Sequence, residues 1–184
     1  MVQKVLEEAE QKMRRTVEAV ERELAGVRTG RATPGLLEPI KVDYYGSQLP
    51  VNQLATVSIP EPRLMVIAPW DPGALQAIEK AIMSSELGIM PQSDGKVIRL
   101  SIPPLTEERR QELAKLVSRM AEDGRVAVRN VRRDANERLD KLENEGVSED
   151  DIKAAKKKVQ DLADKYIQKI DELLDRKVQE IMEE

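Results

Sequence analysis

The sequence lacks cysteine, histidine and phenylalanine, and it has a single tryptophan in 184 residues. The absence of cysteine excludes disulfides and thiol chemistry. The absence of histidine removes the commonest general base and the commonest metal ligand. Zinc sites built from Cys and His are therefore excluded. Catalysis by a carboxylate, a lysine or a serine stays open.

Long apolar runs are also missing. No run reaches the 18 residues of a membrane span, and the charged start, MVQKVLEEAEQKMRR, lacks the apolar stretch of a secretory signal. We therefore expect no membrane partner and a cytoplasmic location, which a chain without cysteine suits.

Proline and charge divide the chain into two kinds of sequence. All ten prolines lie between Pro34 and Pro104. In residues 32–103 only 12 of 72 positions are charged, against 52 of the other 112. This contrast predicts two domains, one inserted into the other: a discontinuous domain of residues 1–30 and 105–184, and an inserted domain of residues 31–104.

The outer segments have the pattern of three amphipathic helices. Apolar residues recur every three or four positions in residues 1–31, the period of a helix with one buried stripe. A second helix follows Pro103-Pro104, with Thr106 as its N-cap. A third begins at Ser148, where SEDD resembles a capping box. The short link between the last two predicts antiparallel neighbours in a three-helix bundle. The stripe expected in the second helix is Leu113, Leu116, Met120, Gly124, Val128, Val131, Ala135, Leu139 and Leu142.

The inserted segment has the pattern of strands around one helix. IKVDYY and LATVSI are rich in β-branched and aromatic residues. LMVIAPW is nearly continuous in apolar residues, as is typical of a strand covered on both faces. KVIRLSI alternates, with Ile98, Leu100 and Ile102 on one face. PGALQAIEKAIMSSELG predicts a helix that begins near Pro72 and ends before Gly88. The expected fold class is α+β, with a small inserted β/α/β domain.

Two chain crossings join the predicted domains, at residues 28–35 and 102–105. Gly30 gives backbone freedom, whereas Pro103 and Pro104 are stiff. We expect a hinge at both crossings, formed by Gly30, Arg31, Pro103 and Pro104.

Four arginines and no acid occur in residues 125–133 of this acidic chain, whose formal net charge is -4. At about 100° per residue, Arg125, Arg129 and Arg132 fall within about 60° beside the apolar stripe, and Arg133 lies a little further round. Like charges without an interleaved Glu repel one another, and the guanidinium fork matches phosphate. The run therefore indicates either a nucleic-acid surface or a solvated helix face. Arg28 and Arg31 are expected to end the first helix.

The distribution of net charge along the chain predicts a bundle whose faces differ in charge. Residues 143–184 carry -5, whereas residues 104–142 carry +2. We therefore expect the bundle to have one acidic and one basic flank, with RNA on the basic one.

Other clusters of charged or aromatic residues are weaker candidates for a functional site. Lys156, Lys157 and Lys158 are surrounded by acids and are expected to form a solvated face. Tyr44, Tyr45 and Trp70 could stack on bases, but we expect at least two of these three in the core. No phosphate loop is present, and no acidic spacing suits a metal or paired-carboxylate catalysis. We expect no enzyme activity, no metal and no cofactor. Two alternatives stay open, a helical module that binds protein through its apolar stripes and an enzyme that uses carboxylates of the inserted domain.

Several long motifs resemble the bacterial ribosome recycling factor family. They are RTGRATPGLLEPIKVDYYG, PLTEERR and RVAVRNVRRDAN, followed by NQLATVSI, AIEKAIMSSELG and SEDD. The resemblance covers essentially the whole chain. It implies an L-shaped molecule made of a three-helix bundle and an inserted β/α/β domain.

The resemblance also implies a function and partners. Family members bind the large subunit of the post-termination ribosome across its A and P sites, contact ribosomal RNA, and act with elongation factor G and GTP to separate the subunits. They are not enzymes. The inserted domain faces elongation factor G. We expect this chain to act as a monomer. The implied RNA-binding residues are Arg28, Arg31, Arg129, Arg132 and Arg133, with Arg125 in the same stretch.

Overall fold

The computed structural model describes residues 1–183, which form two compact units. The first, here called the bundle, comprises Met1–Leu24 and Glu112–Gln179. The second, here called the inserted unit, comprises Ala25–Gln111 and the chain from Glu180 onward. The domain boundaries drawn from the sequence stay predictions. Over the described residues, no helix has the length and apolar character to cross a membrane.

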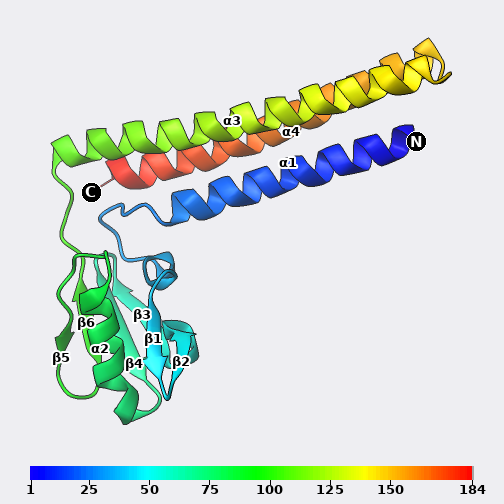
Figure 1. The fold of residues 1–184 in the computed structure, drawn as a ribbon. Coiled ribbons are helices and arrows are strands. Elements are labelled where there is room, and N and C mark those ends of the chain that lie inside the picture. The colour runs from blue at the N-terminus through cyan, green and yellow to red at the C-terminus, as the bar shows by residue number, and fades with distance from the viewer. Residues whose placement is uncertain (184) are drawn as a thin grey trace. The chain divides into compact units, whose positions relative to one another are not determined.

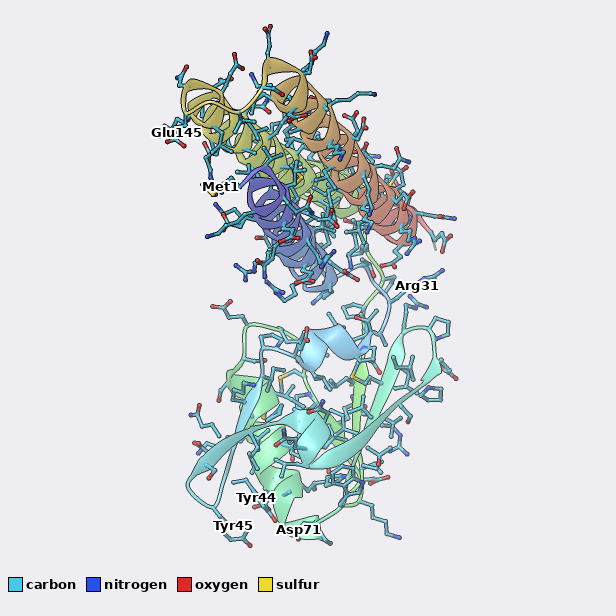
Figure 2. All side chains as sticks on the ribbon, turned by 90° about the vertical axis from the view of Figure 1, so that its right-hand side faces the viewer. Met1, Arg31, Tyr44, Tyr45, Asp71 and Glu145 are labelled. Atoms are coloured by element: carbon cyan, nitrogen blue, oxygen red, sulfur yellow. The ribbon has the colours of Figure 1, made fainter. Side chains whose placement is uncertain are left out.

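Three long helices form the bundle, as the sequence predicts (Figure 1). They are α1 (Val2–Ala25), α3 (Glu107–Asn144) and α4 (Glu149–Met182). Met1 and Glu145 lie at the same end of the bundle (Figures 1 and 2), so α1 and α4 run in one direction and α3 in the other. At 1.5 Å per residue, α3 is about 57 Å long.

Both N-caps predicted from the sequence are confirmed. The Thr106 hydroxyl accepts a hydrogen bond from the Arg109 N–H at 3.1 Å. The Ser148 hydroxyl accepts one from the Asp151 N–H at 3.2 Å. Each hydroxyl satisfies one of the free N–H groups in the first turn of its helix, so both helix starts are set locally.

The turn between α3 and α4 is a Schellman motif. The Val147 N–H donates to the Leu142 carbonyl at 3.0 Å, and the Gly146 N–H donates to the Glu143 carbonyl at 3.1 Å. Gly146 has φ +109°, in the region that favours glycine. This compact turn returns the chain as the expected antiparallel neighbour.

The helices pack closely at Gly124 of α3. A Cβ atom there would lie 2.5 Å from a methyl group of Val20 and 3.3 Å from Ile170 Cδ1. Glycine therefore lets α1 and α4 pack against the backbone of α3. Other buried residues of the bundle are Val5, Ala9, Met13, Val17, Val128, Ala135, Leu139, Ile152, Val159, Ala163 and Tyr166.

The predicted stripe of α3 is wrong at three positions. Val117 and Ala121 are fully buried, whereas Leu116, Met120 and Val131 are only half-buried. Near Gly124 the smaller Val117 and Ala121 fill the interface because the helices pack closely there, and the larger Leu116 and Met120 lie at its edge.

Helix α1 ends earlier than its apolar pattern predicts. It stops at Ala25, so Arg28 and Arg31 follow the helix rather than end it. Gly26 comes next and costs about 1 kcal/mol relative to alanine inside a helix. Gly30 then adopts φ +79°, which is incompatible with a right-handed helix.

The inserted unit contains a four-stranded antiparallel sheet, a two-stranded hairpin and one helix (Figure 1). The order in the larger sheet is β3-β4-β6-β5, and β1 pairs with β2. Short 3₁₀ turns precede β1, β3 and α2. The elements are β1 (Lys41–Tyr44), β2 (Ser47–Pro50), β3 (Ala55–Glu61), β4 (Leu64–Pro69), α2 (Leu75–Ser84), β5 (Gln92–Ser93) and β6 (Ile98–Ser101).

One core joins α2 to the larger sheet. Ile78 and Ile82 of α2 are buried in the same cluster as Met65 and Ile67 of β4. The predicted alternation in β6 is confirmed, with its isoleucine and leucine side chains buried. The expectation that β4 is covered on both faces is wrong, because only alternate residues are fully buried and the others are half-buried.

The expectation that at least two of Tyr44, Tyr45 and Trp70 lie in the core is also wrong. Tyr45 is 88% exposed and Trp70 64% exposed. Tyr45 and Gly46 form the two-residue hairpin between β1 and β2 with φ +50° and +81°. Positive φ at both positions is typical of a type I′ turn. A turn residue points away from the sheet, which explains the exposure of Tyr45.

Tyr44 is half-buried and bound to Asp71 (Figure 2). Its hydroxyl donates to one carboxylate oxygen of Asp71, and the other oxygen accepts the Gly73 N–H at 2.9 Å. The hydrogen bond to Asp71 raises the pKa of Tyr44 to about 12. The same bond, with that from Gly73, lowers the pKa of Asp71.

We expect Gly124→Ala to destabilise the bundle by about 1–3 kcal/mol, because a stiff valine and the facing helix must move to admit a methyl group. The free energy of unfolding from urea denaturation measures this change. Ser118→Ala on the exposed face of α3 is the matched control. Adding Val20→Ala should recover part of the loss. A Gly124→Ala protein as stable as the wild type would contradict the close approach.

We expect Asp71→Asn to lower the pKa of Tyr44 from about 12 toward the ordinary value near 10. Since folding raises this pKa, the stabilisation is fully present below pH 10 and is lost as pH rises through about 12. Phenolate absorbance measures the titration, and Tyr45→Phe in both backgrounds removes the signal of the neighbouring ring. A midpoint that does not move would contradict the hydrogen bond.

Candidate nucleic-acid interface

Four arginines of α3 form one surface, here called the arginine face: Arg125, Arg129, Arg132 and Arg133. All four lie in the continuous helix, so the predicted spacing places them on one side of it. Gly124, Val128 and Ala135 between and beside them are buried. The packing of the bundle therefore fixes the backbone beneath the arginine face.

The arginine face is not free of acids, so the expectation that its like charges go unpaired is wrong. Arg125 contacts Glu122 at 3.0 Å through Nη1 and Asp171 of α4 at 2.7 Å through Nε. Arg129 contacts the second oxygen of Glu122 at 3.2 Å. Glu122 lies just before the stretch that appeared purely basic, three and seven residues from its partners, and Asp171 comes from another helix.

The outer arginines have neutral partners. Arg132 donates to the Gln160 side-chain oxygen of α4 at 3.1 Å. Arg133 donates to the side-chain oxygen of Asn130, one turn earlier. Amide partners leave the positive charge uncompensated, so Arg132 and Arg133 present the stronger attraction for an anion.

The expected basic and acidic flanks of the bundle meet in ion pairs where α3 packs against α4, and the division into two flanks stays a prediction. Asp171 belongs to the acidic helix, yet it binds Arg125 of the basic one. Lys156 of α4 likewise contacts Asp140 of α3 at 2.5 Å. Antiparallel packing brings the two helices side by side, so charges of opposite sign meet along their boundary.

The pKa values reflect this pairing. Hydrogen bonds from Arg125, and then from Arg129, lower the pKa of Glu122. Burial acts to lower the pKa of Arg125, but hydrogen bonds to Asp171 and Glu122 outweigh it and the net shift is upward. Glu122 is therefore a carboxylate at neutral pH and keeps its ion pairs with Arg125 and Arg129 there.

Arg28 and Arg31 belong to the inserted unit. Arg28 is half-buried and donates to the Leu87 carbonyl at 3.3 Å. Arg31 forms an ion pair with Glu183 at 2.7 Å. Their part in RNA binding stays a prediction, as does that of the arginine face.

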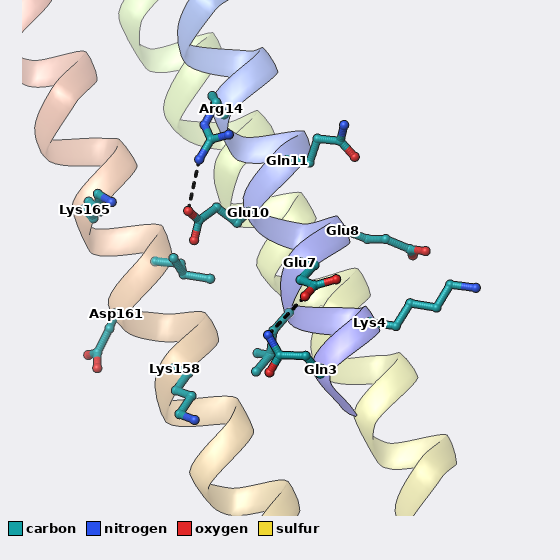
Figure 3. Close-up of a pocket in the computed structure, with 12 residues that line it drawn as sticks. Gln3, Lys4, Glu7, Glu8, Glu10, Gln11, Arg14, Lys158, Asp161 and Lys165 are labelled. Carbon is teal, nitrogen blue, oxygen red and sulfur yellow. Dashed lines mark hydrogen bonds and ion pairs between the residues drawn. The ribbon is translucent and has the colours of Figure 1, made fainter. Parts of the chain in front are cut away.

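A groove on the bundle between α1 and α4 offers a weaker case for a site (Figure 3). Its charges balance, with Lys4, Arg14, Lys158 and Lys165 against Glu7, Glu8, Glu10 and Asp161. Some of these charges are already paired, since Arg14 contacts Glu10 at 3.2 Å. A lining of both signs selects no anion, unlike the arginine face. Within residues 1–183, no cluster of three Asp, Glu, His or Cys side chains could hold a metal ion.

Sequence reasoning missed the partners of the arginines. The two contacts of Glu122 lie within one helix and follow from helical spacing once the window is widened by one turn. Asp171 and Gln160 could not be found in this way, because their proximity depends on how α4 packs against α3.

Comparison with known proteins bears on what this surface is for. The family model described as ribosome recycling factor matches residues 20–182. The ribosome-recycling factor of Carboxydothermus hydrogenoformans is 58% identical over 183 residues, which cover 99% of each chain. That of Geobacillus kaustophilus is 54% identical over 184 residues, which cover 100% of each chain.

Solved structures agree with these relatives. A solution structure of a ribosome recycling factor matches with a TM-score of 0.84 and 49% identity, covering 98% of this chain and 97% of the other. The T. thermophilus ribosome recycling factor, in a structure with E. coli elongation factor G and the E. coli post-termination complex, matches with a TM-score of 0.72 and 47% identity, over 100% of both chains. The resemblance that the motifs suggested is confirmed, and this chain belongs to the ribosome recycling factor family.

Proposed function

We propose that this protein recycles ribosomes after termination. It binds the large subunit of the post-termination ribosome and, with elongation factor G and GTP, promotes separation of the subunits. Membership in the family supports this function. A similar factor, 47% identical, has been placed with elongation factor G on a post-termination complex. Ribosomes are the partner, so we also place its action in the cytoplasm.

The observation that carries the proposal is the arginine face on a bundle whose sequence belongs to this family. Guanidinium groups bind phosphate through two parallel N–H donors, and their planar faces stack on bases. Within residues 1–183, Arg132 and Arg133 have amide partners and no carboxylate partner, so they are available for this purpose. We propose that the arginine face, with Arg28 and Arg31 from the inserted unit, contacts ribosomal RNA.

The bundle suits a part that must transmit force. Ion pairs connect its helices, including Arg138 of α3 with Glu8 of α1 at 2.6 Å. Each exposed pair adds little free energy, so the stiffness comes mainly from the buried stripes. A stiff bundle bound through phosphates can act as a lever on the subunit that it holds.

The protein acts by binding rather than by catalysis. Ribosome recycling factors are translation factors without an enzymatic activity of their own. Hydrolysis of GTP belongs to elongation factor G, which we propose contacts the inserted unit. The energy for subunit separation therefore reaches this chain as a mechanical displacement.

We propose that the two crossings form the hinge that this displacement needs. Gly30 has φ +79°, and a Cβ atom there would lie 3.2 Å from Leu105 Cγ of the other crossing. Pro103 and Pro104 fix φ in the second crossing, while Gly30 and Arg31 supply freedom in the first. Two adjacent crossings of unequal stiffness favour bending about one axis.

We expect Arg132→Gly to fold but to split ribosomes poorly, because it removes a phosphate contact whose partner in the free protein is Gln160. Light scattering of post-termination ribosomes with elongation factor G and GTP measures splitting. Affinity for the large subunit should fall by about tenfold, the value of one charge-assisted contact. Circular dichroism checks the fold.

Arg15→Gly on α1 is the matched control, because it is an exposed arginine with the same helix-propensity cost of about 1 kcal/mol. It should split ribosomes like the wild type. Equal splitting by Arg132→Gly and the wild type would agree with the recycling function but would contradict the proposed role of the arginine face. No splitting by the wild type would overturn the function itself.

We expect the hinge to appear as a broad or multiple distance distribution in single-molecule energy transfer. The chain has no cysteine, so Glu143→Cys and Lys96→Cys give one dye site on each unit. Gly30→Ala should shift the distribution, because a methyl group at this φ costs about 1–2 kcal/mol. A single narrow distribution in the wild type would count against the hinge.

A further inference from the structure

Glu122 binds two members of the arginine face at once. One carboxylate oxygen contacts Arg125 at 3.0 Å, and the other contacts Arg129 at 3.2 Å. An anion that gives one oxygen to each of two guanidinium groups makes the same contacts as a bridging phosphate. The side chain thus occupies the position that an RNA phosphate would take between these two arginines.

The four arginines are compensated unequally. Arg125 has two carboxylate partners, Glu122 and Asp171, and its side chain is only 19% exposed. Arg129 has one carboxylate partner, the shared Glu122. Arg132 and Arg133 have neutral amide partners. A polyanion that approaches the face therefore meets two uncompensated charges at one end and two occupied ones at the other.

Glu122 is held loosely enough to be displaced. Its side chain is 51% exposed, as is typical of ion pairs that water screens and that contribute little stability. Asp171 holds Arg125 from the opposite side through Nε, so this arginine keeps its position when Glu122 leaves. Displacement of Glu122 would expose Nη1 of Arg125 and Nη1 of Arg129 without rearranging α3.

We propose that Glu122 is an internal competitor for the phosphate position at Arg125 and Arg129, and that it sets the selectivity of the arginine face. The proposal rests on the recycling function and on RNA binding by this face. RNA whose phosphates do not match all four arginines gains contacts only with Arg132 and Arg133. The free-energy cost of displacing Glu122 offsets the contacts that it could make with Arg125 and Arg129. Only RNA that matches the whole face gains enough contacts to displace the carboxylate.

The test compares Glu122→Gln with Glu143→Gln, which makes the same change of net charge at an exposed position near the end of α3. Both are titrated against a single-stranded uridine oligonucleotide and against isolated large subunits over a range of salt concentrations. We expect Glu122→Gln to bind the oligonucleotide about two- to fivefold more tightly, with a log–log salt slope steeper by about 1. Binding to the large subunit should change less, so selectivity falls. Glu143→Gln should match the wild type in both.

A third variant tests whether the gain comes from the released arginines. In an Arg129→Gln background, Glu122→Gln should tighten oligonucleotide binding less than it does in the wild-type background, as a double-mutant cycle requires for coupled residues. Unchanged oligonucleotide binding by Glu122→Gln would overturn the proposal. Weaker binding of both partners would overturn it too, because Glu122 would then only orient the arginines.

Failure of the recycling function has a separate signature. It would appear as wild-type protein that does not bind large subunits, whatever the oligonucleotide titration shows. Titration with the oligonucleotide measures the competition by Glu122 directly. Failure of the proposal about Glu122 can therefore be distinguished from failure of the recycling function.

Discussion

The close approach of three helices at Gly124 is the constraint on which the surface of the bundle depends. Val20 and Ile170 fill the space that a side chain at position 124 would take. The next residue on α3 is Arg125, and the next on α4 after Ile170 is Asp171, which pair at 2.7 Å. Because these pairs are adjacent in both helices, the distance that the core sets also brings the charges into contact. A wider spacing of α3 and α4 would separate this pair and release one end of the arginine face.

This coupling explains how an acidic chain can carry the arginine face that we propose binds RNA. Uncompensated arginines along one helix face would attract any polyanion. Here carboxylates from the same helix and from α4 neutralise Arg125 and Arg129, while amides hold Arg132 and Arg133 in place. The partners also restrict the long side chains in the free protein, which would reduce the entropy lost on binding a polyanion. Charge pairing and binding are therefore compatible, since an exposed ion pair exchanges readily for a phosphate.

The sequence predicted most of the fold, and its errors have identifiable physical causes. The three bundle helices and both N-caps followed from local patterns, because Thr106 and Ser148 act within one turn. Strand β2 was missed because SQLP has no apolar alternation, and its pairing depends on the Tyr45-Gly46 hairpin. The two-residue strand β5 was missed because it exists only through its pairing with β6. Aromatic character gave a wrong prediction at Tyr45 and Trp70, since residue type does not reveal a turn or the end of a strand.

The family, the helical period, the helix starts and the presence of four arginines on one face can all be read from the residues along the chain. Each of these is local, set by residues within a few turns or by long motifs. Packing between helices sets which arginines keep their charge free, because Asp171 and Gln160 are 46 and 28 residues away from their partners along the chain. It also decided that Val117 and Ala121 rather than Leu116 and Met120 fill the interface. Contacts between helices depend on their separation and rotation, which the packing of side chains in three dimensions sets and a period along one helix does not contain.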